Sequence, residues 1–359
     1  MLVSLLKRAF ASAAPGKPFE EGKLAYERGA LDDAQRLLDD ATKSDPHNAE
    51  AFLYAGLTAY QRERYGDAHS HFERAIAINP ESPEYRYQAG AAEYMLGNED
   101  AAWRRCDEAL ERDPDYTLAH LLMSRIALPG PLYTTMLSAI HQAVRPRTYI
   151  EIGVCTGKSI RLALPETKAI GVDPAPRIEG GALPPNVTLH TMKSDDYFAK
   201  HSVRDDFGGL PIDLAFIDGL HHFEYALRDF INVERHCTPR STVLVHDWFP
   251  LNRHTAERAY TSVFFSGDVW RLALILKKYR PDLTIATVGS PPTGLGLIRN
   301  LDPGSTVLQE NYDAIVAEFM ALDYSVLDHD KAGTLNLFPN DVPKVLELLS
   351  KPAPEITGA

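Results

Sequence analysis

The stretch Y-I-E-I-G-V-C-T-G-K-S, from Tyr149 to Ser159, decides the fold of the C-terminal part of this chain. An apolar, β-branched run reaches a carboxylate, Glu151, and then opens into a glycine turn that should lead into a helix. A second apolar run, A-I-G-V-D-P, contains Asp173 at its end, 22 residues after Glu151. Glycines let a backbone approach a ligand closely, and an acid at the end of the second strand accepts hydrogen bonds from ribose hydroxyls. The two runs therefore predict a nucleotide-binding β–α–β unit.

The glycine spacing of this turn differs from two common phosphate-binding patterns. Gly153 and Gly157 lie four residues apart, so the turn lacks the G-x-G-x-x-G spacing of dinucleotide-binding enzymes. A P-loop ending in G-K-S would need its first glycine where this chain has Ile152. Losing one residue breaks the nest of backbone N–H groups that wraps phosphates. Glu151 also repels phosphate, whereas an acid suits the sulfonium and amino groups of S-adenosylmethionine.

Composition indicates a globular protein of two domains. The chain has 359 residues, of which 45% are hydrophobic and 24% charged. Its net charge of −12 argues against nonspecific binding to nucleic acid or to an anionic membrane, since both need a basic face. Cys106, Cys155 and Cys237 are far apart and fit a reducing compartment, and no apolar run reaches the roughly 18 residues of a membrane span. We therefore predict a cytoplasmic protein, with a frayed leader over 1–17 and a disordered tail over 351–359.

A period of 34 residues runs through the N-terminal third of the chain. Five columns follow it: Pro46, Pro80 and Pro114; Gly22, Gly56 and Gly90; Tyr26, Tyr60 and Tyr94; Ala34, Ala68 and Ala102; Ala41, Ala75 and Ala109. This pattern resembles the tetratricopeptide repeat, a helix–turn–helix unit with small residues where helices cross. We predict an all-α repeat domain over 18–128, in which a last helical segment, Leu118 to Ile126, caps three repeats.

The repeat domain has three alternative roles. Its concave side could bind a protein or peptide partner, it could brace the C-terminal domain, or it could form a homo-oligomer. The candidates for a binding groove are aromatic and basic: Tyr54, Arg62, Tyr85, Arg86, Tyr87 and Arg104.

Strands alternate with helices between residues 129 and 300, which predicts a doubly wound, mostly parallel α/β sheet. The expected strands are 148–154, 168–173, 187–192, 212–218, 242–247, 283–288 and 294–299. The short connection from Gly289 to Gly294 predicts a hairpin that makes one edge strand antiparallel. Ligands of such sheets bind beyond the carboxyl ends of the strands, so the strand-end acids are site candidates. Residues 301–350 are expected to form a helical extension.

Four motifs in order resemble a class I, Rossmann-like S-adenosylmethionine-dependent methyltransferase. They are E-I-G-V-C-T-G-K-S, G-V-D-P, D-L-A-F-I-D-G-L-H-H and T-V-L-V-H-D-W, all between Arg147 and Asn300. The D-G-x-H…H-D pattern is similar to the group of macrocin-type sugar O-methyltransferases.

The resemblance implies roles for individual residues. Glu151, Gly153 and Gly157 match the cofactor loop, and Asp173 matches the acid that binds the ribose hydroxyls. Ser194 and Asp195 fall where an adenine-contacting acid is usual. Asp218 and Asp247 match carboxylates that hold a divalent metal in some members, and His221 matches a proposed general base.

One position departs from the metal-dependent relatives. They carry a second acid immediately before the aspartate at Asp247, whereas this chain has His246. Asp218, Asp247 and His246 could still hold Mg²⁺ or another divalent metal, but imidazole favours a softer ion or none. Metal dependence stays open, and so does a purely structural role for each carboxylate.

The expected function is O-methylation of a small hydroxylated acceptor, such as a sugar or glycosylated metabolite. A hydroxyl is a weak acid and needs a base or a metal, and His221 lies three residues past Asp218 at a strand end. The long segment after the fifth strand offers Asn252, Arg253 and His254 as acceptor contacts or as plain loop residues. Two alternatives remain: an interaction scaffold whose cofactor domain is non-catalytic, and a protein methyltransferase that docks its substrate on the repeats.

Overall fold

The computed structural model describes residues 17–260 and 264–350, and the chain divides into two compact units, Met1–Ile126 and Ala127–Ala359. The expected tail, 351–359, and all but the last residue of the expected leader lie outside the described residues. None of the described helices has the length and apolar character needed to span a membrane.

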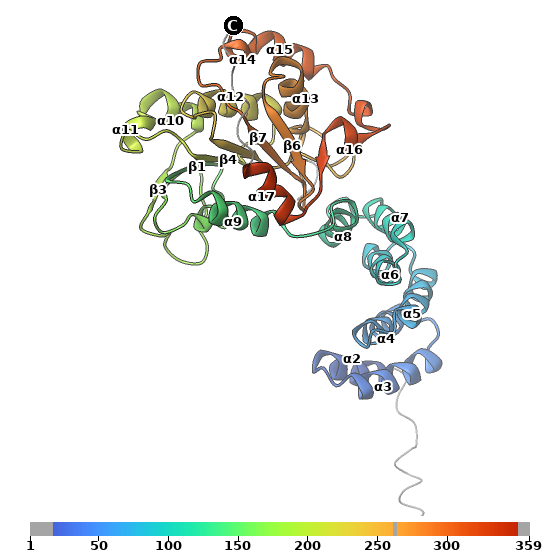
Figure 1. Ribbon diagram of the computed structural model, residues 1–359. Coiled ribbons are helices and arrows are strands. Elements are labelled where there is room, and N and C mark those ends of the chain that lie inside the picture. The colour runs from blue at the N-terminus through green and yellow to red at the C-terminus, as the bar shows by residue number, and fades with distance from the viewer. Residues whose placement is uncertain (1–16, 261–263, 351–359) are drawn as a thin grey trace, which may run out of the picture. The chain divides into compact units, whose positions relative to one another are not determined.

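The first unit contains the three predicted helix pairs and the capping helix (Figure 1). They are α2 (Lys17–Glu27), α3 (Leu31–Ser44), α4 (Ala49–Gln61), α5 (Tyr65–Ile78), α6 (Pro83–Met95), α7 (Glu99–Leu110) and α8 (Thr117–Ala127). The glycine column lies where the helices of one pair cross. A Cβ on Gly22 would lie 2.8 Å from Leu38, and one on Gly56 only 2.5 Å from Phe72. The 34-residue glycine period therefore records close helix packing.

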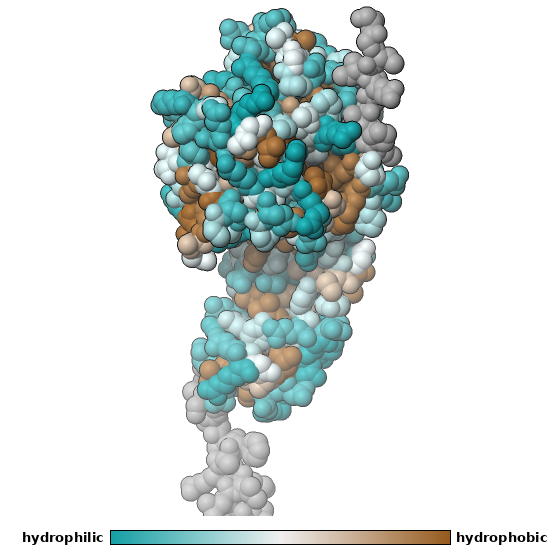
Figure 2. Space-filling view, turned by 60° about the vertical axis from the view of Figure 1, so that its left-hand side comes forward, coloured by the Kyte–Doolittle hydropathy of each residue, from teal (hydrophilic) through white to brown (hydrophobic). Residues whose placement is uncertain are grey.

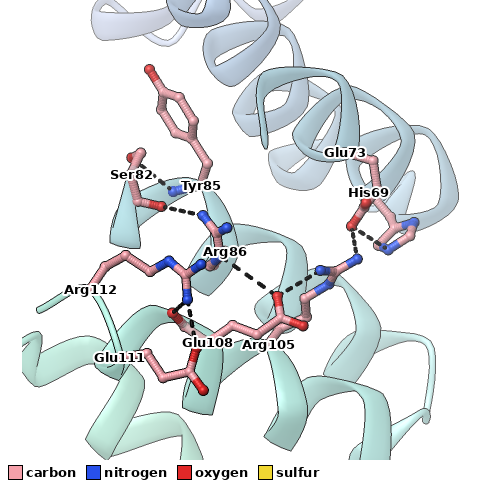
Figure 3. A network of polar contacts seen from close by, with 9 residues as sticks. All are labelled: His69, Glu73, Ser82, Tyr85, Arg86, Arg105, Glu108, Glu111 and Arg112. Atoms are coloured by element: carbon pink, nitrogen blue, oxygen red, sulfur yellow. Dashed lines mark hydrogen bonds and ion pairs between the residues drawn. The ribbon is translucent and has the colours of Figure 1, made fainter. Parts of the chain in front are cut away.

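The aromatic and basic groove candidates are partly used in packing between repeat helices. Arg86 is only 6% exposed and Tyr85 7%, so neither presents a free side chain to a partner. The Arg86 guanidinium donates to the Ser82 carbonyl oxygen at 3.5 Å and lies 3.7 Å from a carboxylate oxygen of Glu108. Figure 3 shows these contacts between neighbouring helices. Arg62 forms an ion pair with Asp32 of the neighbouring pair. Tyr85 and Arg86 are therefore wrong as groove residues, because burial between helices already occupies them.

The second unit is built on one eight-stranded mixed sheet, with strand order β3-β2-β1-β4-β5-β7-β6-β8. The strands are β1 (Thr148–Ile152), β2 (Lys168–Val172), β3 (Val187–His190), β4 (Leu214–Ile217), β5 (Thr242–Val245), β6 (Thr284–Val288), β7 (Leu295–Arg299) and β8 (Leu337–Phe338). Strands β1 to β5 are parallel, as predicted. The chain winds outward from β1 to β3 and then returns to place β4 on the other side of β1. The carboxyl ends of β1 and β4 thus form the switch point of the sheet.

Helices cover both faces of this sheet (Figure 1). Ile150 and Ile152 of β1 face α12 (Phe223–Glu234) and α13 (Trp270–Tyr279), within the larger apolar core. Tyr149 faces the other way, into a core shared with α9 (Tyr133–Val144) and α17 (Val342–Ser350). This alternation follows from the two-residue period of a strand. The outer surface of the sheet domain in the view of Figure 2 is mainly hydrophilic, with smaller apolar patches.

The turn after β1 and the position of β7 differ from the predictions. The turn leads only into a short 3₁₀ segment, Ile160–Leu162, and the chain then reaches Pro165, which disfavours helical backbone at the residue before it. The predicted hairpin exists, but its antiparallel strand β7 lies inside the sheet, between β5 and β6. β7 is therefore not an edge strand, because it pairs with β5 on one side and with β6 on the other.

The C-terminal extension belongs to the sheet domain. It contains α14 (Val307–Glu310), α15 (Tyr312–Met320), the 3₁₀ segment Tyr324–Leu327, α16 (Lys331–Thr334), β8 and α17. β8 pairs with β6 in parallel, and Ile315 and Phe319 of α15 enter the larger core. The expected boundary at residue 300 therefore separates no independent unit, since residues 127–359 form one compact unit.

Candidate active site

The site begins where the glycine turn after β1 crosses the end of β4. Gly153 has φ +85°, and a Cβ there would lie 2.0 Å from the carbonyl oxygen of Asp218. Only glycine fits this close approach of two backbones. Gly157 also has positive φ, +81°, and its N–H donates to Val154 O at 2.8 Å to close the turn. The two glycines therefore shape the turn beside Asp218.

Two carboxylates and a histidine converge at the ends of β4 and β5. His221 Nε2 lies 3.1 Å from Asp247 Oδ2 and 3.8 Å from Asp218 Oδ1. Asp247 is 4% exposed and adopts left-handed backbone geometry, φ +57°. Its other oxygen, Oδ1, accepts a hydrogen bond from Thr293 Oγ1 at 2.7 Å, so its Oδ2 faces the histidine. The predicted catalytic residues Asp218, His221 and Asp247 are thus brought together.

His246 also lies close to both of these carboxylates. Its Nδ1 lies 3.3 Å from Asp218 Oδ1 and 3.2 Å from Asp247 Oδ2. Burial lowers the pKa of His246, but the two carboxylates outweigh burial and raise this pKa well above 6.5. At Asp247 burial acts to raise the carboxyl pKa, and the two histidines reverse this, so that the pKa is lowered. The geometry favours a charged His246 beside Asp218 and Asp247.

The loop after β5 fixes the orientation of His221. Its Nδ1 lies 2.8 Å from the Phe265 carbonyl oxygen, so Nδ1–H donates and Nε2 is directed to the carboxylates. Gly267 packs against the same turn: a Cβ there would lie 1.8 Å from His221 O. Burial lowers the pKa of His221, but Asp247 and then Asp218 outweigh burial and raise it.

An ion network holds this loop against the start of α12. Asp268 Oδ1 accepts a hydrogen bond from the Phe223 N–H at 3.0 Å, which satisfies a free donor at the helix N-terminus. Arg258 joins Asp268 Oδ2 and Glu224 Oε1, each at 2.6 Å. Arg271 contributes a second ion pair to Asp268. Sequence reasoning missed this network, because its members are far apart along the chain.

Two cavities meet at the cluster. One has a volume of about 500 Å³ and is lined by residues that include Asp173, Ser194, Asp195, Tyr225 and Asp229. The other has a volume of about 400 Å³ and is lined by residues that include Tyr133, Lys158, His246, Asp247, Phe264 and Phe265. Four residues line both cavities: Gly153, Cys155, Asp218 and His221. A group transferred from a ligand in one cavity to a ligand in the other would move past these four shared residues.

Glu151 lines neither cavity, contrary to its predicted place in the cofactor loop. Its carboxyl group is fully buried, accepting hydrogen bonds from Tyr149 Oη and Ser159 Oγ, each at 2.6 Å. Burial raises the pKa of Glu151 from 4.5 to about 8, although both hydrogen bonds oppose the shift. The reason is that side chains alternate along β1, so Glu151 lies on the same face of the sheet as Tyr149. There its hydrogen bond with Ser159 supports the turn.

The remaining cofactor candidates line the larger cavity. Asp173 Oδ2 accepts hydrogen bonds from the N–H groups of Val154 and Cys155, at 2.9 and 2.8 Å, so it also ties the turn to β2. Ser194 begins α10 (Ser194–Lys200), and Asp195 forms an ion pair with Arg228 at 3.0 Å. The cavity lining also includes Asp229 of α12. Burial raises the pKa of Asp229 to about 7.

The metal-ligand geometry adds His221 to the predicted set. The ligand atoms of Asp218, His221 and Asp247 all lie within 4.8 Å of one another. His246, which was predicted as the third ligand, also has its Nδ1 within 3.3 Å of an oxygen of each carboxylate. Among the acceptor candidates, Arg253 instead pairs with Asp323 at 3.1 Å, and the cavity uses Phe264 and Phe265 of the same segment.

Comparisons with known proteins agree with this architecture. Residues 150–248 match the family model described as a methyltransferase domain, and residues 19–78 and 59–126 match two models described as tetratricopeptide repeats. The central part of the sheet domain therefore matches a methyltransferase domain, and the N-terminal helices match tetratricopeptide repeats.

Individual relatives match over limited lengths. The TPR repeat-containing thioredoxin TTL4 of Arabidopsis thaliana is 30% identical over 128 residues, which are 34% of this chain and 19% of that protein. Superkiller complex protein 3 of Mus musculus is 32% identical over 85 residues, or 24% of this chain and 5% of that protein. The chain thus spans a fifth or less of either relative. The crystal structure of MamA is 21% identical and covers 34% of this chain and 71% of its own, with a TM-score of 0.32.

Proposed function

We propose that this protein transfers a methyl group from S-adenosylmethionine to a hydroxyl oxygen of a small acceptor, such as a sugar or glycosylated metabolite. The observation that carries the proposal is the shared wall of the two cavities. Methyl transfer is an in-line displacement, which needs two ligands to meet at one point from separate pockets. Asp218 and His221 lie at that point.

The larger cavity fits the charge of this cofactor. Its lining includes four aspartates and one lysine: Asp173, Asp195, Asp218, Asp229 and Lys193. When bound, S-adenosylmethionine supplies an electrophilic methyl group on a positively charged sulfonium. An acidic lining suits the sulfonium, the ammonium group and the ribose hydroxyls, and it opposes a phosphate-bearing ligand. Asp173 would bind the ribose hydroxyls while its backbone contacts keep the turn in place.

The smaller cavity would hold the acceptor. A hydroxyl placed beside His221 would give its proton to Nε2, because the Phe265 carbonyl holds Nδ1 as the donor side of the ring. Asp247 would then stabilise the imidazolium at 3.1 Å. Phe264 and Phe265 would exclude water, and Lys158 would attract a polar or acidic part of the acceptor.

The same cluster fits a divalent cation as the alternative to a base. Asp247 Oδ2 is buried and faces His221 Nε2 at 3.1 Å and His246 Nδ1 at 3.2 Å. Asp218, His221 and Asp247 together offer two carboxylate oxygens and one imidazole nitrogen, which suit Mn²⁺ or a softer ion better than Mg²⁺. Held there, a cation would lower the pKa of the acceptor hydroxyl.

We also propose a cytoplasmic location and a protein partner on the repeats. The described repeat helices leave apolar side chains exposed, among them Leu24, Met95 and Leu96. A brace or a homo-oligomer remains the alternative role. Light scattering of the intact protein would read out self-association directly.

Calorimetric titration of S-adenosylmethionine into the intact protein tests the enzymatic proposal. Wild type should bind with micromolar affinity, and Asp173→Ala should lose binding. Asp205→Ala is the matched control, since Asp205 is exposed and lines neither cavity. His221→Gln should bind the cofactor nearly as well as wild type but release no S-adenosylhomocysteine with any member of a sugar and glycoside panel that wild type methylates.

The outcomes separate the alternatives. Sensitivity of turnover to a chelator, restored by Mn²⁺, would assign the cluster to a metal; insensitivity would assign it to the His221 base. Absence of cofactor binding by wild type would contradict the enzymatic proposal and favour the scaffold. Methylation of a repeat-bound protein, with no small acceptor used, would favour the protein methyltransferase.

A further inference from the structure

A second group of side chains that could hold a metal ion lies outside the two cavities, at the C-terminal end of β3. His190 is the last residue of β3, His201 follows the last residue of α10, and Asp206 ends α11 (Val203–Asp206). The ligand atoms of these three side chains all lie within 4.8 Å of one another. None of the three lines either of the two cavities at the active site.

The spacing of two of these atoms matches a metal polyhedron. His201 Nδ1 and Asp206 Oδ2 are 3.4 Å apart. Zinc bonds of about 2.1 Å in a tetrahedral site place neighbouring ligand atoms about 3.4 Å apart. The separation is long for a charge-assisted hydrogen bond, which is usually near 2.8 Å. The distance between these two atoms therefore suits a shared metal ion better than a direct hydrogen bond from His201 to Asp206.

Surrounding contacts orient the three side chains toward one point. The buried Tyr197 donates its hydroxyl to Asp206 Oδ2 at 3.0 Å and stacks on the His201 ring at 5.0 Å between centroids. The His190 and His201 rings meet edge to face, with centroids 4.6 Å apart. Across the described residues, no hydrogen bond to the His190 ring competes with a metal. Histidines and carboxylates that bind a metal need contacts of this kind with neighbouring side chains, because these contacts keep the ligands in a fixed orientation.

We propose that His190, His201 and Asp206 bind one divalent transition-metal ion, with Zn²⁺ as the best match. Two imidazoles and one carboxylate favour Zn²⁺ or Co²⁺ over Mg²⁺ and Ca²⁺, which prefer oxygen ligands. The side chains of His201 and Asp206 are each 29% exposed, which leaves the ion a path of entry and a position for water.

The ion would join β3, α10 and α11. α10 and α11 follow β3 along the chain and lie on one side of the sheet domain (Figure 1). The carbonyl oxygen of His190 accepts the Asp173 N–H at 3.1 Å, so the site lies directly behind one wall of the larger cavity. We infer a structural ion that stabilises this wall.

Zinc binding to the intact protein tests the proposal without reference to activity. The experiments use an Asp247→Asn background, because the cluster at the active site could otherwise bind Zn²⁺ as well. Competition with a chromophoric chelator should then report one equivalent, and Co²⁺ should give the visible absorption of an imidazole-bound ion. Zn²⁺ should also raise the melting temperature.

His201→Ala and Asp206→Asn should each weaken Zn²⁺ binding at least about tenfold and abolish the shift in melting temperature. Asp206→Asn keeps the acceptor for Tyr197, so it should fold normally without metal. His236→Ala is the matched control, since the His236 ring stacks on Phe198 and is not part of the proposed metal site. Equal Zn²⁺ affinity in all of these variants, or absence of binding in the background protein, would overturn the proposal.

Discussion

The buried Glu151 should make the sheet domain less stable as the pH rises, and the substitution Glu151→Gln should remove this pH dependence. Its side chain is inaccessible to solvent, and burial raises its pKa from 4.5 to about 8. At a pH between these two pKa values, Glu151 is ionised in the unfolded chain but keeps its proton in the folded protein. The folded state therefore loses stability as the pH rises, by about 1.4 kcal/mol per pH unit. Over the whole window the loss is about 5 kcal/mol.

Glutamine at this position cannot ionise but still accepts and donates hydrogen bonds. From pH 5 to pH 8, Glu151→Gln should therefore gain about 4 kcal/mol in stability relative to wild type. Below pH 4.5 the two proteins should show parallel pH profiles, because the carboxyl group is then protonated in both states.

Urea unfolding followed by tryptophan fluorescence measures this effect. Trp248 and Trp270 are buried in the sheet domain, so a Trp103→Phe background removes the signal of the repeats. Glu166→Gln is the control, because the Glu166 side chain is 50% exposed. If wild type and Glu151→Gln keep a constant difference in unfolding free energy from pH 5 to pH 8, the account of Glu151 is wrong.

Three further predictions concern the site. Cys155 is the only exposed cysteine and lines both cavities, so S-adenosylhomocysteine should slow its alkylation; an unchanged rate would place the ligand elsewhere. Gly153→Ala should prevent folding of the sheet domain or cost more than about 3 kcal/mol by urea unfolding, because its Cβ would lie 2.0 Å from a carbonyl oxygen. Gly208→Ala, which shares positive φ but meets nothing within 4 Å, should cost only about 1 kcal/mol. Arg258→Met should lower kcat while leaving cofactor affinity near wild type, since Arg258 holds the loop that orients His221; a loss confined to cofactor binding would refute that positioning role.

The fold could be predicted where local pattern determines it. β1 and β2 lie within two residues of their predicted ends, because apolar β-branched runs bounded by glycine or proline have few other solutions. The pairing between strands could not be predicted in the same way. β8 comprises only Leu337 and Phe338, too short for any period, and the interior position of β7 depends on contacts far apart in the sequence.

The site shows the same division. Asp218, His221 and Asp247 were predictable, because parallel strands end at one edge of a sheet and the switch point follows from strand order. Glu151 was misplaced, although the alternation along β1 already puts it on the face of Tyr149. The Arg258 network could not be predicted, since it joins a loop to a helix start through side chains with no periodic signal.

His246 determines how the charge of the cluster is balanced. The imidazole of His246 lies 3.2 to 3.3 Å from both carboxylates. A charged imidazole there supplies positive charge that a cation would otherwise supply, and it competes for the carboxylate oxygens that would bind one. An acid would do the opposite, because it adds a negative charge that only a cation can offset. His246 therefore weakens the demand for a metal at this cluster, and His221, which lines both cavities, stays the proposed proton acceptor.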